Sequence, residues 1–276
     1  MRDPLPPELA GRFVRRGDDR RSALVRRDFA DAFDELGLLE AADLEPASLV
    51  EAARRAGLEG ARLAGGASGR GTIAVLPAGA PGRAGIRPYR RGGLARRFSR
   101  RRYLWGRRAE RELVVTERLR ARGVPVVEPL AAVRSEVGPG YRAALVTRWE
   151  EEVRPAGAAL HGLSADEAAP ILRAVGRTAA RLHAAGGWHA DLHVDNLLVR
   201  ETRGAAGEPL PLLVDLDRGR TFPFPIPRIV GRRSLRRLTR HLRKHGLAGA
   251  AAATQALRDA YAAERDRLRD ERQEEG

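Results

Sequence analysis

Apolar side chains recur at the three- to four-residue spacing of an amphipathic helix in several stretches of the chain. The polar segment 1–57 carries one such stripe, at Leu24, Phe29, Phe33 and Leu36. Residues 109–122 predict a second helix, because a glycine and a proline follow it directly. Ser164 and Glu167 fit a capping box, which predicts a third helix from this point. Its apolar stripe is formed by Ile171, Leu172, Val175, Ala179 and Leu182.

Short apolar runs bounded by glycine and proline predict strands. The first run contains a glycine-rich turn and is typical of a β-hairpin. The extended runs are 61–79 (the hairpin), 85–93, 124–133, 141–149 and 210–217. From residue 232 onward the pattern is helical and rich in arginine, and we expect this helix to fray after Arg269.

The order of these elements predicts two lobes, because strands dominate the first half of the chain and helices the second. We expect a helical N-terminal extension over residues 1–57, a strand-rich lobe over 58–150 and a mainly helical lobe over 151–276. The fold class is therefore α+β, with a cleft between the lobes.

Composition limits the classes of function. The chain has 276 residues, 51 Lys and Arg against 36 Asp and Glu, a formal charge of +15 and no cysteine. Without cysteine there is no disulfide, thiolate metal site or cysteine nucleophile. No apolar run reaches the ~20 residues that cross a bilayer, and the first residues lack the apolar stretch of a signal peptide, so we expect a cytoplasmic protein. The charge suits nucleic acid, an anionic membrane surface or a phosphorylated substrate, although the preference for arginine over lysine is also typical of a compositional habit.

One polar segment has the residue types that phosphoryl transfer needs. Transfer from ATP requires a carboxylate that orients the acceptor hydroxyl and takes its proton, and a second carboxylate and an amide oxygen that hold Mg²⁺. Asp191 and Asn196 lie five residues apart on one predicted loop, and an apolar strand leads to Asp215. This order, HxDxxxxN followed by an aspartate after a strand, is that of protein-kinase-like folds. The alternative is a polar loop whose Asp and Asn side chains only cap turns.

The chain also resembles the lipopolysaccharide kinases, most closely those that act on 3-deoxy-D-manno-octulosonic acid (Kdo). The resemblance covers about residues 65–245 and leaves residues 1–57 outside. It rests on YRRGGLARRFSRRRYLW, RELVVTERLRARGVPVVEPLAA, YRAALVTR, HADLHVDNLLV, VDLDRGR and RRSLRRLTRHLRK. It implies a bilobal protein-kinase-like fold, with an antiparallel sheet and a helix in the N-lobe and mainly helices in the C-lobe.

The resemblance implies a role for each residue of the series. Asp191 would be the catalytic base, and Asn196 and Asp215 would hold Mg²⁺ with the bound ATP. His189 would support the loop beneath Asp191, and Asp217 would lie just outside the metal site. The roles of His193 and Asp195 are left open.

Two further ATP-binding features are implied in the N-lobe. Gly66, Gly69 and Gly71 would form the loop over the phosphates, although a surface turn explains these glycines equally well. Glu112 would pair with the cation that contacts ATP, with Glu110 and Glu117 as rivals. That cation is a lysine in general kinases, but the only lysine here is Lys244, so we expect Arg87, or else Arg90, in its place.

The function that follows is ATP- and Mg²⁺-dependent transfer of phosphate to a sugar hydroxyl, most simply the 4-OH of Kdo on Kdo–lipid A. The basic stretch 90–108, with its interleaved aromatic residues, and a second basic face between Arg232 and Arg243 would meet an acidic lipopolysaccharide acceptor and the anionic inner-membrane surface, on which the protein would be peripheral. No nucleic-acid partner is expected. The alternatives are a heptose or protein kinase of the same fold, a pseudokinase that binds anionic surfaces without turnover, and a nucleic-acid-binding protein. The oligomeric state is not predicted.

Overall fold

The computed structural model describes residues 5–41, 43–65, 71–79, 82–89, 107–137, 140–200 and 211–274. The chain divides into two compact units, and each is described by itself. The first unit comprises Met1–Val114 and Glu128–Glu150, and the second comprises Val115–Val127 and Glu151–Gly276. The chain passes from the first unit to the second within helix α4 (Arg108–Ala121).

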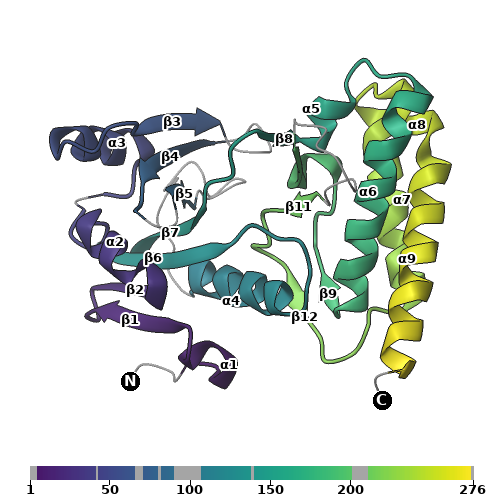
Figure 1. The fold of residues 1–276 in the computed structure, drawn as a ribbon. Helices are drawn as coiled ribbons and strands as arrows, with labels where there is room; N and C mark the ends of the chain where they lie inside the picture. Colours follow the sequence, from purple (N-terminus) through teal and green to yellow (C-terminus); the bar gives the residue numbers. More distant parts are fainter. Residues whose placement is uncertain are drawn as a thin grey trace. The chain divides into compact units, whose positions relative to one another are not determined.

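The first unit is built on a seven-stranded antiparallel sheet, seen in Figure 1. Its strands are β1 (Phe13–Gly17), β2 (Arg21–Arg26), β3 (Arg62–Gly65), β4 (Thr72–Pro77), β5 (Arg83–Pro88), β6 (Pro129–Val137) and β7 (Gly140–Arg148). They lie in the order β1-β2-β6-β7-β5-β4-β3. The predicted hairpin is confirmed, since β3 pairs with β4 and Gly65 lies opposite Thr72.

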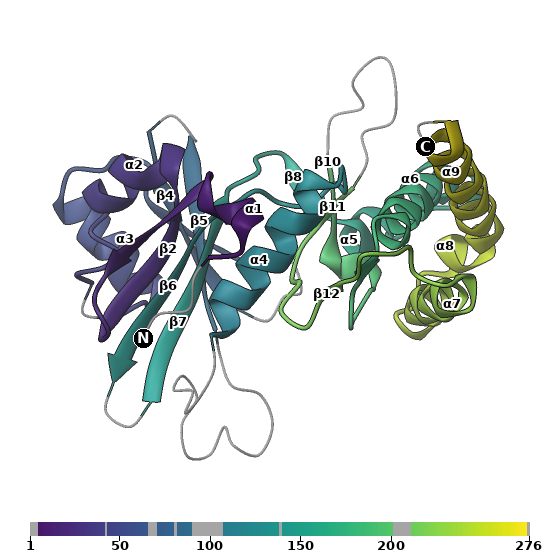
Figure 2. The same cartoon turned by 90° about the horizontal axis from the view of Figure 1, so that it is seen from below.

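Helices cover both faces of this sheet, which explains why its central strands are apolar at successive positions. In β2 the side chains of Ala23 and Val25 join one buried cluster, and that of Leu24 joins another. The first cluster packs under the short helix η1 (Arg27–Phe29) and helices α2 (Ala30–Glu35) and α3 (Pro46–Arg55); the second packs under α1 (Pro7–Ala10) and the start of α4. Figure 2 shows α2 and α3 on the opposite side of the sheet from α4.

The prediction of a helical extension over residues 1–57 was wrong for part of this segment. β1 and β2 form one edge of the sheet, with Val25 of β2 opposite Ala131 of β6. Apart from the short helix α1, the segment becomes helical only from residue 27 onward. Pairing with a strand more than a hundred residues away decided the structure of 21–26, and local spacing does not report such a contact.

The second unit is mainly helical. Its helices are α5 (Ala156–Leu160), α6 (Ala165–Ala184), η3 (Val194–Asn196), α7 (Arg228–Lys244), α8 (Ala248–Ala252) and α9 (Thr254–Glu274). Its short strands are β8 (Val153–Pro155), β9 (Gly187–Trp188), β10 (Leu197–Arg200), β11 (Leu212–Leu213) and β12 (Arg220–Thr221). The expected fraying after Arg269 is not observed, because α9 continues to Glu274.

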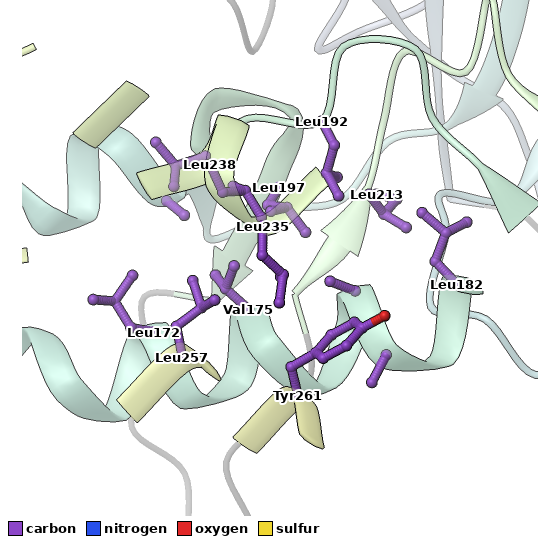
Figure 3. Close-up of a cluster of buried hydrophobic side chains, with 14 of the residues drawn as sticks. Leu172, Val175, Leu182, Leu192, Leu197, Leu213, Leu235, Leu238, Leu257 and Tyr261 are labelled. Atoms are coloured by element: carbon purple, nitrogen blue, oxygen red, sulfur yellow. The ribbon is translucent and has the colours of Figure 1, made fainter. Parts of the chain in front are cut away.

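Helix α6 organises the core of this unit. The predicted capping box is present: the Glu167 backbone N–H donates to Ser164 Oγ, and the Ser164 N–H donates to Glu167 Oε2. The apolar face of α6 lies in one buried cluster with Leu192, with leucines of β10 and β11, and with leucines of α7 and α9, as Figure 3 shows. A Cβ on Gly176 would lie 2.4 Å from the carbonyl oxygen of Leu257, so glycine is what lets α9 approach α6 this closely.

Two of the predicted strands are shorter in the structure. Within 210–217, only Leu212 and Leu213 form a strand among the described residues, and Asp215 follows in a loop. Within 124–127, Val126 makes an isolated bridge to Leu213. Among the described residues, no helix combines the length and the hydropathy needed to span a membrane.

Candidate functional site

Two short pairs of strands bring the loops with Asp191 and Asp215 together in the second unit. At one end Trp188 of β9 lies opposite Arg220 of β12, and at the other Leu197 of β10 lies opposite Leu213 of β11. The segments 189–196 and 214–219 therefore connect the same two pairs of strands. Because both ends are paired, the two loops run side by side.

His189 links the two loops directly. Its ring is buried, its Nδ1 accepts the Asp191 backbone N–H at 3.1 Å, and its Nε2 lies 3.1 Å from the Val214 carbonyl oxygen. Because Nδ1 accepts, the proton lies on Nε2, which donates to Val214. Burial lowers the pKa of His189, although the carboxylates of Asp215 and Asp191 oppose this effect. His189 therefore supports the loop beneath Asp191, as the resemblance implied, and it also holds the Asp215 loop through Val214.

Asn196 connects the loops a second time and presents an unused oxygen. Its side chain is buried, and Nδ2 donates to the Asp191 carbonyl oxygen at 3.0 Å and contacts His193 Nε2 at 3.2 Å. Its own backbone carbonyl accepts the Val214 N–H at 3.1 Å. These contacts assign the amide orientation, since the reverse would place Oδ1 against a carbonyl oxygen. Oδ1 is then buried without a hydrogen-bond partner in the described chain.

Asp191 and Asp215, one on each loop, are both exposed. The Asp191 side chain is 76% exposed, and Asp215 is exposed as well. Asp215 has a φ of 61°, in the left-handed region that residues other than glycine seldom adopt. Backbone strain of this kind is concentrated at functional sites, where the surrounding structure holds it in place.

These groups fit a magnesium ion. Mg²⁺ prefers hard oxygen ligands from carboxylates, carbonyls and water. The Asn196 Oδ1 atom has unused acceptor capacity in a buried position, where an unmatched polar atom costs free energy. An exposed carboxylate follows on the neighbouring loop, at Asp215.

A second network, which sequence reasoning did not assign, supports the loop from α7. His241 Nε2 lies 3.0 Å from Asp195 Oδ2, and the His241 ring stacks on that of His193 with centroids 4.8 Å apart. His193 Nε2 in turn lies 3.5 Å from Asp191 Oδ2. A Cβ on Gly157 would lie 2.1 Å from Asp195 Oδ1, so glycine makes room for this carboxylate. The sequence predicted a helix with a basic face here, but not a histidine that contacts the loop.

Helix α7 makes one further contact with the same loop. The Arg237 guanidinium donates to the carbonyl oxygen of Ala190, the residue before Asp191. The sequence placed Arg237 on a basic face for anionic partners, and here the residue supports the loop backbone. Both contacts fix the loop through groups other than the Asp191 carboxylate.

In the first unit, Arg87 and Glu112 form the ion pair that the sequence predicted. Arg87 Nη2 lies 2.7 and 2.8 Å from the two carboxylate oxygens of Glu112. Glu112 is 1% exposed and also accepts a hydrogen bond from the Tyr89 hydroxyl. Burial, together with the charge of Glu112, raises the pKa of Tyr89 well above its usual value.

The two rival glutamates of α4 have other arginine partners. Glu110 pairs with Arg15 at 2.7 Å, and Glu117 pairs with Arg120 at 2.9 Å. Among the three glutamates, the contact with Arg87 therefore belongs to Glu112. That Arg87 contacts ATP stays a prediction.

The glycine-rich turn is only partly described. Gly66 and Gly69 lie outside the described residues, as does Arg90, the second arginine considered for contact with ATP. Gly71 immediately precedes β4, and a Cβ there would meet nothing within 4 Å. Packing in the described structure therefore does not demand a glycine at residue 71, and the phosphate loop stays a prediction.

An antiparallel sheet with a partly buried Arg–Glu pair, together with a helical unit carrying these two loops, is typical of protein-kinase-like proteins. This predicted fold class is confirmed. The model of the lipopolysaccharide kinase (Kdo/WaaP) family matches residues 58–261. Because the match covers most of the chain, the protein belongs to this family.

Curated relatives carry the name 3-deoxy-D-manno-octulosonic acid kinase. One from Xanthomonas euvesicatoria pv. vesicatoria (strain 85-10) is 42% identical over 163 residues, 58% of this chain and 61% of the relative. One from Stenotrophomonas maltophilia (strain R551-3) is 39% identical over 186 residues, 65% of this chain and 69% of the relative. The chain spans about three fifths of the length of the Xanthomonas relatives it matches.

Among solved structures, one match is titled "WaaP in complex with acyl carrier protein". It covers 79% of this chain and 92% of that chain, with a TM-score of 0.42 and 17% identity. A similarity of this size carries no functional argument.

Proposed function

We propose that this protein is an ATP- and Mg²⁺-dependent kinase that phosphorylates a sugar hydroxyl of the lipopolysaccharide inner core, the 4-OH of Kdo on Kdo–lipid A. The observation that supports it most directly is the pair of loops tied by His189. They carry two exposed aspartates and the unpartnered Asn196 Oδ1 in the order typical of kinases. The choice of Kdo as the acceptor is supported by membership of the family and by the names of the relatives.

Asp191 is the group that receives the proton of the acceptor hydroxyl. Its carboxylate is exposed, so an acceptor can reach it, while its backbone is held by His189 through the N–H and by Asn196 through the carbonyl. The carboxylate stays accessible to the hydroxyl, with His193 Nε2 as a neighbour at 3.5 Å. A positioned base of this kind contributes typically 10²–10⁴-fold to the rate.

Asn196 Oδ1 and the Asp215 carboxylate would hold Mg²⁺. When bound, the ion supplies charge that offsets the negative phosphates. In the first unit, Arg87 offers a guanidinium whose N–H groups match phosphate oxygens, while Glu112 holds it in place. Arginine cannot be deprotonated, so it can replace the usual lysine as a permanent cation.

The acceptor is an acidic sugar on a lipid, so we also propose that the protein works in the cytoplasm at the inner-membrane surface. An excess of 51 basic over 36 acidic residues favours association with an anionic leaflet. Phosphate and carboxylate groups of the acceptor would be drawn to the same charge.

The test compares three isosteric variants in one assay. Labelled ATP is incubated with Kdo–lipid A, and mass spectrometry locates one added phosphate on Kdo. We expect Asp191→Asn and Asp215→Asn each to lose about 10³-fold or more in turnover while remaining folded. Asp270→Asn, at an exposed position of α9, is the control and keeps the wild-type rate.

The other outcomes identify the rival functions. Label transferred to heptose or to protein side chains, but not to Kdo, would replace the acceptor while keeping the kinase. ATP binding without transfer to any acceptor would indicate a pseudokinase. Near-normal turnover in either loop variant would remove that residue's assignment.

A further inference from the structure

Outside the two loops, α7 and α9 of the second unit enclose a pocket of about 480 Å³ that no step of the proposed function uses. This volume is within the range of small-ligand sites. Five arginines line it, but only one carboxylate, that of Asp266. The arginines are Arg228, Arg232, Arg236, Arg258 and Arg265. The lining therefore carries a formal excess of four positive charges.

Helical spacing explains how the arginines gather on facing surfaces. Arg228, Arg232 and Arg236 follow one another at intervals of four residues along α7 and so form one stripe. Arg258 and Arg265 are seven residues, or two turns, apart on α9. Two stripes of like charge thus line one pocket, and because four of the five arginines are exposed, they give this surface a positive potential that attracts anions.

Most of these guanidinium groups make no hydrogen bond or ion pair with other described residues. Arg228 forms an ion pair with Asp266, and Arg265 Nη2 donates to the Ile226 carbonyl oxygen at 3.1 Å. Among the described residues, the side chains of the other three make no hydrogen bond or ion pair. The Nη1 atom of Arg265 is buried and has no hydrogen-bond partner there.

The rest of the lining is apolar. Leu235, Tyr261 and Ala262 contribute to it, and the first two are largely buried. The Tyr261 hydroxyl already contacts His183 Nδ1 at 2.9 Å. The polar groups in the pocket that make no hydrogen bond are therefore guanidinium groups, which are cationic hydrogen-bond donors. They favour a ligand that carries negative charge and hydrogen-bond acceptors.

We propose that this pocket is a binding site for a phosphate monoester, on a phosphorylated saccharide or a lipid headgroup. A dianionic phosphate offers several oxygens to several guanidinium groups at once, which a single carboxylate does not. The site is separate from the transfer site, because Arg236 lines the pocket while the adjacent Arg237 faces the Asp191 loop. The proposal does not rest on kinase activity.

The experiment measures binding of the full chain, without nucleotide or divalent ion, to two probes. Glycerol 3-phosphate is titrated by calorimetry with glycerol as the neutral control, and vesicles of phosphatidylcholine with and without phosphatidic acid are tested by co-sedimentation. The pocket variant is Arg232→Gln with Arg236→Gln. The matched control is Arg55→Gln with Arg272→Gln, which removes the same charge from exposed positions of α3 and α9 outside the pocket.

We expect the pocket variant to weaken phosphate binding by about 10- to 100-fold and the control variant to leave it within about twofold. The probe that is held identifies the source of the phosphate, soluble or lipid-borne. Equal losses in both variants would show that net charge alone binds the probes, and binding unchanged in the pocket variant would also overturn the proposal. Kinase turnover is measured separately on the same variants, so failure of this site and failure of the proposed function are distinguishable.

Discussion

The two units fix their candidate site residues in different ways. The first unit uses a side-chain ion pair, Arg87–Glu112, and the second uses contacts to the backbones of the Asp191 and Asp215 loops. In the first unit, a side-chain carboxylate is buried and engaged by a guanidinium and a phenol. In the second unit, His189 and Asn196 tie the backbones of the two loops, and Asp191 and Asp215 are exposed residues.

The difference fits the roles proposed for these groups. A carboxylate that accepts a proton or holds a metal would have to stay accessible, and His189 and Asn196 support the loops through backbone groups. Glu112 would only orient a cation, and it is buried. Under the proposed function, the burial of a carboxylate would therefore distinguish an anchoring acid from a reacting one.

Replacing His189 is expected to have the largest effect among the tests of this comparison. In His189→Phe, the Val214 carbonyl and the Asp191 N–H both lose their partners, and the loop loses its direct tie to the neighbouring loop through His189. We expect kcat to fall about 100-fold, because small displacements of a reacting group have effects of this size. Stability should fall by about 2–4 kcal/mol for two unsatisfied backbone groups.

Turnover and urea unfolding measure the two effects. His161→Phe, at an exposed histidine after α5, is the matched control and should change neither quantity. A His189→Phe protein with normal kcat would show that backbone ties do not position Asp191.

A smaller effect is expected in the first unit. Arg87→Ala leaves the buried Glu112 without its cation, and we expect a loss of about 2–3 kcal/mol, below the range for fully buried pairs because the Arg87 side chain is 31% exposed. Arg87→Lys keeps the charge and should lose less. Chemical denaturation measures both.

Arg120→Ala is the matched control, since it removes a guanidinium of similar exposure from the buried Glu117. Its loss of stability should be similar, but only the Arg87 variants should raise the KM for ATP. Equal KM values in both would remove Arg87 from the nucleotide site.

The smallest effect at neutral pH concerns His183, a buried histidine that supports neither loop. Burial lowers its pKa to about 3, against 6.5 for an ordinary histidine. Below pH 6.5 the unfolded chain therefore binds a proton that the folded chain does not. Stability should fall by about 1.4 kcal/mol per pH unit from this residue as the pH drops from 6.5 toward 3.

Urea unfolding at several pH values below neutrality measures the slope. His183→Phe should be less steep than the wild type by this amount. Tyr261→Phe, which removes only the hydroxyl partner, should retain the wild-type slope. A His183→Phe protein as pH-sensitive as the wild type would place the titrating group elsewhere.

Sequence patterns predicted correctly those structural elements that depend on residues close together in the chain. The capping box at Ser164 and the hairpin that places Gly65 opposite Thr72 were confirmed, because each depends on residues close in sequence. The segment 21–26 was assigned wrongly because β2 is apolar on both faces and pairs with β6, far along the chain. Spacing also placed Asp215 at the end of a strand, whereas the strand ends at Leu213 and the aspartate adopts a left-handed backbone.

For the candidate site, the order of residues along the chain was enough to select Asp191, Asn196 and Asp215, because phosphoryl transfer needs those groups and the motif holds them at short separations. The proximity of the two loops depends on pairing at both of their ends and on the burial of His189. His241 reaches Asp195, and arginines of α7 and α9 face one pocket, through packing between distant segments. Neighbours in sequence impose their preferences before the chain is compact, whereas contacts between distant residues exist only once the hydrophobic core has formed around them.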